Sequence, residues 1–125
     1  MNGNKYQELA MRTNDRKAKE RLKYQVDYNN MITDIGGILN ACLGLSGEVG
    51  ELNDLVKKFI FHQKPMDEVH FKKEIGDVCW YIAMICESCG YNLDDILQMN
   101  IDKLKSRYPE GFDVGRANNR KEGDI

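Results

Sequence analysis

Two short acidic motifs in the middle of the chain have the composition of a metal site. Glu48 and Glu51 stand three residues apart, and Glu74 and Asp77 repeat this spacing after an interval of 22 residues. Residues three apart on a helix share one face, about one turn apart. Each pair would therefore present two carboxylates in the same direction, and carboxylate oxygens are the ligands that hard divalent cations prefer.

Both acidic pairs are predicted to lie on the apolar sides of their helices. On a helical wheel at about 100° per residue, apolar side chains gather within about 60° of Glu48. They are Ala41, Leu45, Leu52, Leu55 and Phe59. The residues that the wheel places beside Asp77, apart from Glu74, are Tyr81, Met84 and Ile85. Carboxylates on an apolar face are costly unless they are protonated or bound to a cation.

The two pairs are also placed symmetrically about a helix breaker, the segment 63–66 with its proline. Residues 48 and 77 share their sequence midpoint with residues 51 and 74, just after His62. A hairpin folded there would bring all four carboxylates within roughly 5–6 Å of one level. Two unit charges at 4 Å repel by about 1 kcal/mol in water and about 4 kcal/mol at an effective dielectric constant of 20. The pattern favours a magnesium site, with manganese as a substitute, over solvated faces of ordinary charged helices.

Length and composition indicate one globular domain. The chain has 125 residues, 42% of them hydrophobic and 30% charged, with a net charge of −2. This charge argues against a nucleic-acid partner. No apolar run approaches the length of a membrane span, and no secretory pattern opens the chain, so we expect a cytoplasmic protein without a membrane partner. The four cysteines are then expected as thiols.

Three of the cysteines fall on the apolar face of one predicted helix. Cys79, Cys86 and Cys89 are expected to be small core residues there. Cys86 and Cys89 also form a single CxxC, and Cys42 would complete four possible ligands, so a redox or zinc role is the alternative.

Hydrophobic periodicity and capping residues predict an all-α protein. Helices are expected over residues 4–13, 38–61, 68–89 and 92–107, and residues 16–30 form a poorly packed helix or a mobile excursion. Asp34, Asp67 and Asn92 are expected as N-caps, and Gly90 and Pro109 as stop signals. The third helix, 68–89, is apolar over most of its circumference and should be the most buried. Residues 1–113 are expected as a single domain and residues 114–125 as a polar, flexible tail.

Two further patterns each have two explanations. Gly44, Gly47 and Gly50 recur every three residues beside the acids, which indicates either close approach of a ligand or tight helix packing. Asn100, Lys103 and Arg107 line one side of the last helix next to its apolar face. They could contact phosphate, or their stems could cover the rim of a core.

Taken together, these blocks resemble the all-alpha nucleoside triphosphate pyrophosphohydrolases, the MazG-like superfamily. The resemblance rests on the two acidic motifs with their spacing and on their flanks, residues 43–51, 73–81 and 100–112. The opening segment 6–13 is similar to that of the short bacterial and phage members. The resemblance implies a four- to five-helix MazG-like bundle, in which a central antiparallel hairpin carries the metal site and oligomerisation completes the fold.

The resemblance also implies the activity and the residue roles. The reaction would be Mg²⁺-dependent hydrolysis of a (d)NTP to the monophosphate and pyrophosphate, for nucleotide pool control or house-cleaning, by a homodimer or homotetramer. Glu48, Glu51, Glu74 and Asp77 would hold the metal, and one of the glutamates would orient or deprotonate water. The substrate-binding residues would be Asn100, Lys103, Arg107, Tyr81, Lys57, Lys58 and His62. Residues 14–35 match no motif, so the base that is recognised stays open.

Two other classes of protein compete with this interpretation. One is a non-catalytic helical interaction or regulatory module that retains an acidic metal pocket. The other is a di-iron carboxylate bundle, which requires Glu-x-x-His on two helices. The chain offers only Asp67-x-x-His70, at a helix start.

Overall fold

The computed structural model describes residues 1–125 and is entirely helical. In chain order the elements are α1 (Gly3–Ala10), the 3-10 helix η1 (Met11–Thr13), α2 (Ala18–Tyr28), α3 (Ile35–Phe61), α4 (Glu68–Cys89), α5 (Leu93–Arg107) and α6 (Val114–Asn118). The predicted all-α class is confirmed. The expected count of four to five helices is too low, because α6 forms within the segment that was expected to be a loose tail.

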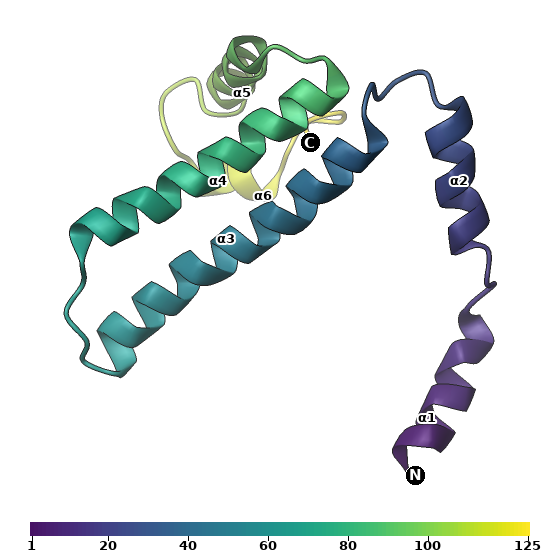
Figure 1. Cartoon of the computed structure of the whole chain (residues 1–125). Helices are drawn as coiled ribbons and strands as arrows, with labels where there is room; N and C mark the ends of the chain where they lie inside the picture. Colours follow the sequence, from purple (N-terminus) through teal and green to yellow (C-terminus); the bar gives the residue numbers. More distant parts are fainter.

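The centre of the fold is an antiparallel hairpin of α3 and α4, which lie side by side along most of their length (Figure 1). Asp34 caps α3 by accepting a hydrogen bond from the Gly37 backbone N–H, and Asp67 caps α4 by accepting one from the His70 N–H. A capping side chain satisfies one of the first backbone donors of a helix, which have no partner within it. Both predicted caps and the central hairpin are therefore confirmed.

A tight turn separates α4 from α5. Gly90 ends α4 with φ of 71°, a left-handed conformation that glycine adopts without strain. Asn92 caps α5 through a bond from the Asp94 N–H, and acidic residues occupy its first turn. Both signals act through backbone groups only a few residues away. The structure confirms the predicted end of α4 at Gly90 and the predicted cap of α5 at Asn92.

The first helices lie apart from the hairpin. In Figure 1, α1, η1 and α2 form an arm that leaves the hairpin at the start of α3. No residue of this arm is buried. The segment 16–30 is thus a helix that packs poorly, one of the two possibilities that its weak apolar stripe allowed.

The buried core is small and lies where the start of α3 meets the end of α4. It consists of Gly37, Ala41, Cys86, Ser88 and Cys89. The Ser88 carbonyl oxygen accepts hydrogen bonds from the Thr33 hydroxyl at 2.7 Å and from the Asp34 N–H at 3.0 Å. These bonds fasten the chain entering α3 to the last turn of α4.

One prediction about burial is wrong for this chain, and a second is confirmed only in part. Cys86 and Cys89 are core residues as expected, but Cys79 is exposed, and all four cysteines are free thiols. The helix expected to be the most buried, α4, does contain more buried residues than any other helix, but it also exposes large apolar side chains such as Ile75 and Trp80, the latter at 60%. The physical reason is that α3 covers one side of α4 and no other element packs along the rest.

No helix of the structure is both long enough and apolar enough to span a membrane.

At Gly44, the Tyr81 side chain of α4 packs directly against the backbone of α3. A Cβ atom added at Gly44 would collide with the Tyr81 ring, whereas one added at Gly47 or Gly50 would meet nothing within 4 Å. Of the two explanations for this glycine series, tight packing therefore accounts for Gly44. The Tyr81 ring also makes an edge contact with Trp80, with 5.0 Å between ring centroids.

We expect Gly44→Ala to destabilise the protein by about 1–3 kcal/mol, because the ring or the helices must shift to admit a methyl group. Gly47→Ala is the matched control, since it adds the same group in open space and gains about 1 kcal/mol of helix propensity. Chemical unfolding of both variants measures the difference. Equal stabilities of the two variants would contradict the packing role of Gly44.

Candidate metal centre

The hairpin brings three of the four predicted carboxylates together. Glu48 from α3 and Glu74 and Asp77 from α4 each offer one oxygen, and these oxygens lie within 4.8 Å of one another. Glu51, one turn after Glu48, is exposed but lies close enough to influence the pKa values of Glu48 and Glu74. The mirror placement about the turn thus produces a compact acidic cluster.

Two oxygens of this cluster lack partners. The Oε2 atoms of Glu48 and Glu74 are buried and form no hydrogen bond. A buried polar atom without a partner costs roughly 1–3 kcal/mol, and more when it carries charge. The site therefore has oxygen ligands and an unmet demand for a positive charge, which a divalent cation would satisfy.

Proton affinity in the cluster is redistributed. Burial raises the pKa of Glu48 from 4.5 to about 7, and its hydrogen bonds with Glu74 and Glu51 and the charges of Glu51 and Asp77 add to the rise. The hydrogen bond with Glu51 is the main influence that lowers the pKa of Glu74, and bonds with Glu48 and His70 contribute. Without metal, Glu48 thus binds a proton more readily than Glu74, as expected for carboxylates that share one site.

His70 is a site residue that sequence reasoning missed. Its Nε2 atom lies 3.0 Å from Oε1 of Glu74, whose side chain is only 13% exposed. The sequence pattern Asp67-x-x-His70 did not indicate this contact. The position of His70 four residues before Glu74 could have indicated it, because this spacing places both side chains on one face of α4.

A groove of about 420 Å³ adjoins the cluster at the turn end of the hairpin. Its polar lining consists of Glu51, Asp54, Lys58, Lys64, Asp67, His70 and Glu74. Lys58 pairs with Asp54 at 2.7 Å, and Lys64 is a second amine that sequence reasoning missed. Acids for a cation and amines for an anion thus lie in one groove, an arrangement that suits a metal-bound polyphosphate.

The other sequence candidates lie outside this groove. Lys57 and His62 do not line it. The hydrogen bond with Lys58 is the main influence that lowers the pKa of Asp54, and the charges of Lys57 and His62 add to this effect. Tyr81 packs on Gly44, one turn beyond Asp77.

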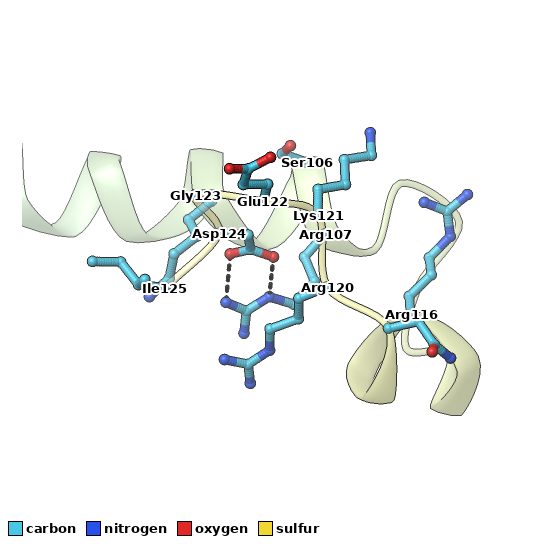
Figure 2. Close-up of a pocket in the computed structure, with 11 residues that line it drawn as sticks. Ser106, Arg107, Arg116, Arg120, Lys121, Glu122, Gly123, Asp124 and Ile125 are labelled. Atoms are coloured by element: carbon cyan, nitrogen blue, oxygen red, sulfur yellow. Dashed lines mark hydrogen bonds and ion pairs between the residues drawn. The ribbon is translucent and has the colours of Figure 1, made fainter.

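The α5 candidates are also separate from the groove. Asn100, Lys103 and Arg107 do not line it, and Arg107 forms a two-bond ion pair with Asp124 of the tail, at 2.9 and 2.6 Å (Figure 2). A single chain therefore does not place these α5 residues in the groove beside the acids.

Comparison with known proteins agrees with the geometry. The family model described as the MazG nucleotide pyrophosphohydrolase domain matches residues 37–112. The chain is also similar to the Gene 37 protein of Mycobacterium phage L5, with 34% identity over 92 residues, which is 69% of this chain and 79% of the phage protein. No solved structure matches the chain significantly. The family match contains the whole acidic cluster and α5, and it ends before α6.

In the absence of metal, we expect the protein to lose stability as the pH rises from about 4.5 to about 7. Because the pKa of Glu48 is higher in the folded state, the folded protein holds a proton that the unfolded chain releases across this interval. Glu48→Gln should remove this loss. Thermal unfolding in chelator at several pH values measures it, with Glu87→Gln, an exposed glutamate on α4, as the control. If the stability of Glu48→Gln depends on pH as steeply as that of the wild type, the proton on Glu48 is not the cause.

Proposed function

The chain belongs to the MazG nucleotide pyrophosphohydrolase family, and we propose that it is a Mg²⁺-dependent nucleoside triphosphate pyrophosphohydrolase. The proposed reaction is hydrolysis of the α–β phosphoanhydride of a (d)NTP to (d)NMP and pyrophosphate. The observation that carries this proposal is the pair of buried, unpartnered carboxylate oxygens of Glu48 and Glu74 beside Asp77.

The donor set fits magnesium. Glu48, Glu51, Glu74 and Asp77 would hold the ion, since all-oxygen ligation suits a hard cation, and manganese is the expected substitute. When bound, magnesium neutralises phosphate charge and lowers the pKa of coordinated water. Replacing the proton on Glu48 by the ion would also remove the repulsion among these carboxylates.

The residues of the chain then position the substrate and move one proton. A water oxygen forms a bond to one phosphorus of the α–β anhydride and the bond from that phosphorus to the bridging oxygen breaks. The other half of the substrate departs with the bridging oxygen, and the products are (d)NMP and pyrophosphate. A glutamate of the cluster orients this water and accepts its proton, in a role for which carboxylates with raised pKa values are suited. His70 fixes the orientation of Glu74 through the 3.0 Å contact. Lys58 and Lys64 supply positive charge in the groove.

Further substrate contacts are proposed from the sequence. Lys57 and His62 lie near Asp54 at the groove edge, and Tyr81 lies one turn beyond Asp77. Asn100, Lys103 and Arg107 would meet the triphosphate only if α5 of one chain approaches the groove of another. This requirement links the activity to assembly.

We propose that the active form is a homodimer or homotetramer. A compact monomer of 14.4 kDa exposes roughly 6,800 Å², whereas this chain exposes 10533 Å², an excess of about 3,700 Å². Permanent protein interfaces bury roughly 2,000–5,000 Å² over both partners together. Each chain contributes half of such an interface area. The excess area of one chain is therefore large enough for its share of more than one extensive interface.

We place the enzyme in the cytoplasm, where its four free thiols stay reduced. Its role there would be nucleotide pool control or house-cleaning, with the (d)NTP rather than nucleic acid as the substrate.

We expect turnover of at least one (d)NTP in magnesium to give monophosphate plus pyrophosphate, and Glu74→Gln to reduce kcat at least about 100-fold by removing a metal ligand. A panel of canonical and modified (d)NTPs, with chromatographic separation of all phosphate products, measures both and ranks the substrates. Glu87→Gln on the same helix is the control and should retain full activity.

Diphosphate plus phosphate as products would refute cleavage at the α–β bond while leaving the metal site intact. No turnover of any nucleotide despite magnesium binding would instead favour a non-catalytic module with an acidic pocket.

We expect the protein to sediment as a dimer or tetramer, and Trp80→Asp to shift it toward smaller species because it places a charge on an exposed apolar face of α4. Asn53→Asp, which adds the same charge on the polar side of α3, should leave the assembly unchanged. Analytical ultracentrifugation measures both variants. A monomeric wild-type protein with full activity would contradict the proposed assembly.

A further inference from the structure

The C-terminal tail and the end of α5 enclose a second cavity, separate from the groove beside the acids. Its volume is about 410 Å³, and it shares no lining residue with that groove. Five cationic side chains line it, Lys103, Arg107, Arg116, Arg120 and Lys121, against two acidic ones, Glu122 and Asp124. Most of these residues follow position 112, where the family match ends.

A buried arginine at the centre of this cavity holds a carboxylate. The Arg107 side chain is only 10% exposed, and its Nε and one terminal nitrogen donate to the two oxygens of Asp124 (Figure 2). Two parallel N–H···O bonds from a guanidinium group recognise carboxylate and phosphate with the same geometry. Arg107 is therefore already aligned for a planar pair of anionic oxygens.

Positive charge around this pair exceeds what one carboxylate neutralises. Arg120 lines the same cavity and lies close enough to Asp124 to influence its pKa, whereas in Figure 2 Arg116 points away from the carboxylate. The bond from Arg107 keeps the pKa of Asp124 below its ordinary value, and the charges of Arg107, Arg120 and Lys103 act in the same direction. Three cations thus face one negative charge.

We propose that Arg107, Arg120 and Lys103 form a second binding site, for a phosphate group, and that Asp124 occupies it when no ligand is bound. A phosphate carries up to two negative charges and more acceptor oxygens than a carboxylate, so it satisfies these three cations better. Binding of a phosphate displaces Asp124 and releases the tail from α5.

The phosphate could come from two sources. It could belong to the triphosphate substrate of a neighbouring copy, which rests on the proposed function, or to free pyrophosphate, which does not. In the first case the site contributes to the KM for the nucleotide. In the second it senses a phosphate ligand independently of turnover.

The test is calorimetric titration of the full chain with inorganic pyrophosphate in chelator, so that the metal centre takes no part. We expect Asp124→Asn to bind pyrophosphate about tenfold more tightly than wild type, because the internal competitor loses its charge. Arg120→Gln should bind about tenfold more weakly. Arg120 forms no ion pair in the structure, so this variant keeps the contact between tail and helix even if Asp124→Asn loosens it.

Glu122→Gln is the matched control. It removes the same charge from the same tail, and Figure 2 shows its carboxylate on the other side of the tail from the Arg107 guanidinium. Its affinity should equal that of wild type. The proposal is overturned if no form binds pyrophosphate, if Glu122→Gln and Asp124→Asn bind alike, or if Arg120→Gln has no effect.

Nucleotide kinetics in magnesium then identify the source. A KM lowered in Asp124→Asn with kcat unchanged assigns the site to the substrate, whereas an unchanged KM assigns it to free pyrophosphate. A chain without hydrolytic activity would refute the proposed function, while the titration in chelator would still decide whether the site exists.

Discussion

Carboxylates held within 4.8 Å of one another repel unless a proton or a cation lies among them, and the packing of α3 against α4 holds them at this distance. Other contacts in the structure hold the two helices in this arrangement. The bonds to the Ser88 carbonyl fix the start of α3 on the end of α4, and the Tyr81 ring on Gly44 sets the distance between the helices one turn from Asp77. Burial of Glu48, together with the neighbouring carboxylates, raises its pKa, so a proton takes the place that a metal ion would occupy.

The sequence predicts those parts of the fold that depend on neighbouring residues. The caps Asp34, Asp67 and Asn92 and the stop at Gly90 depend on backbone groups a few residues away, so propensity and spacing suffice. The meeting of Glu48 with Glu74 and Asp77 was also predictable, because one turn relates both halves of the hairpin. The roles of these residues in catalysis remain predictions that activity measurements must test.

Other features depend on contacts that no local pattern encodes. The exposure of Cys79 and Trp80 was not predictable, because an apolar periodicity does not reveal whether the covering surface belongs to the same chain. The sequence left Arg107 as either a phosphate contact or a residue at the rim of a core. Its partner in the structure is Asp124, 17 residues away in a segment that was expected to be a flexible tail. His70 was not predicted as a site residue, because the spacing from Asp67 explains only its backbone N–H. Its side chain lies on the face of α4 that also carries Glu74.

The uneven distribution of buried contacts along the hairpin has a mechanical consequence. All five buried residues lie where α3 begins and α4 ends, while the groove opens at the opposite end, next to the connecting turn. The two helices are therefore held together at one end by the buried core and at the other by the connecting residues 62–67, with the carboxylates between these two ends. Local opening needs least free energy where few apolar contacts are lost. Opening at the groove end would therefore cost less free energy than opening at the core, and under the proposed function it would admit or release the metal ion and the polyphosphate there.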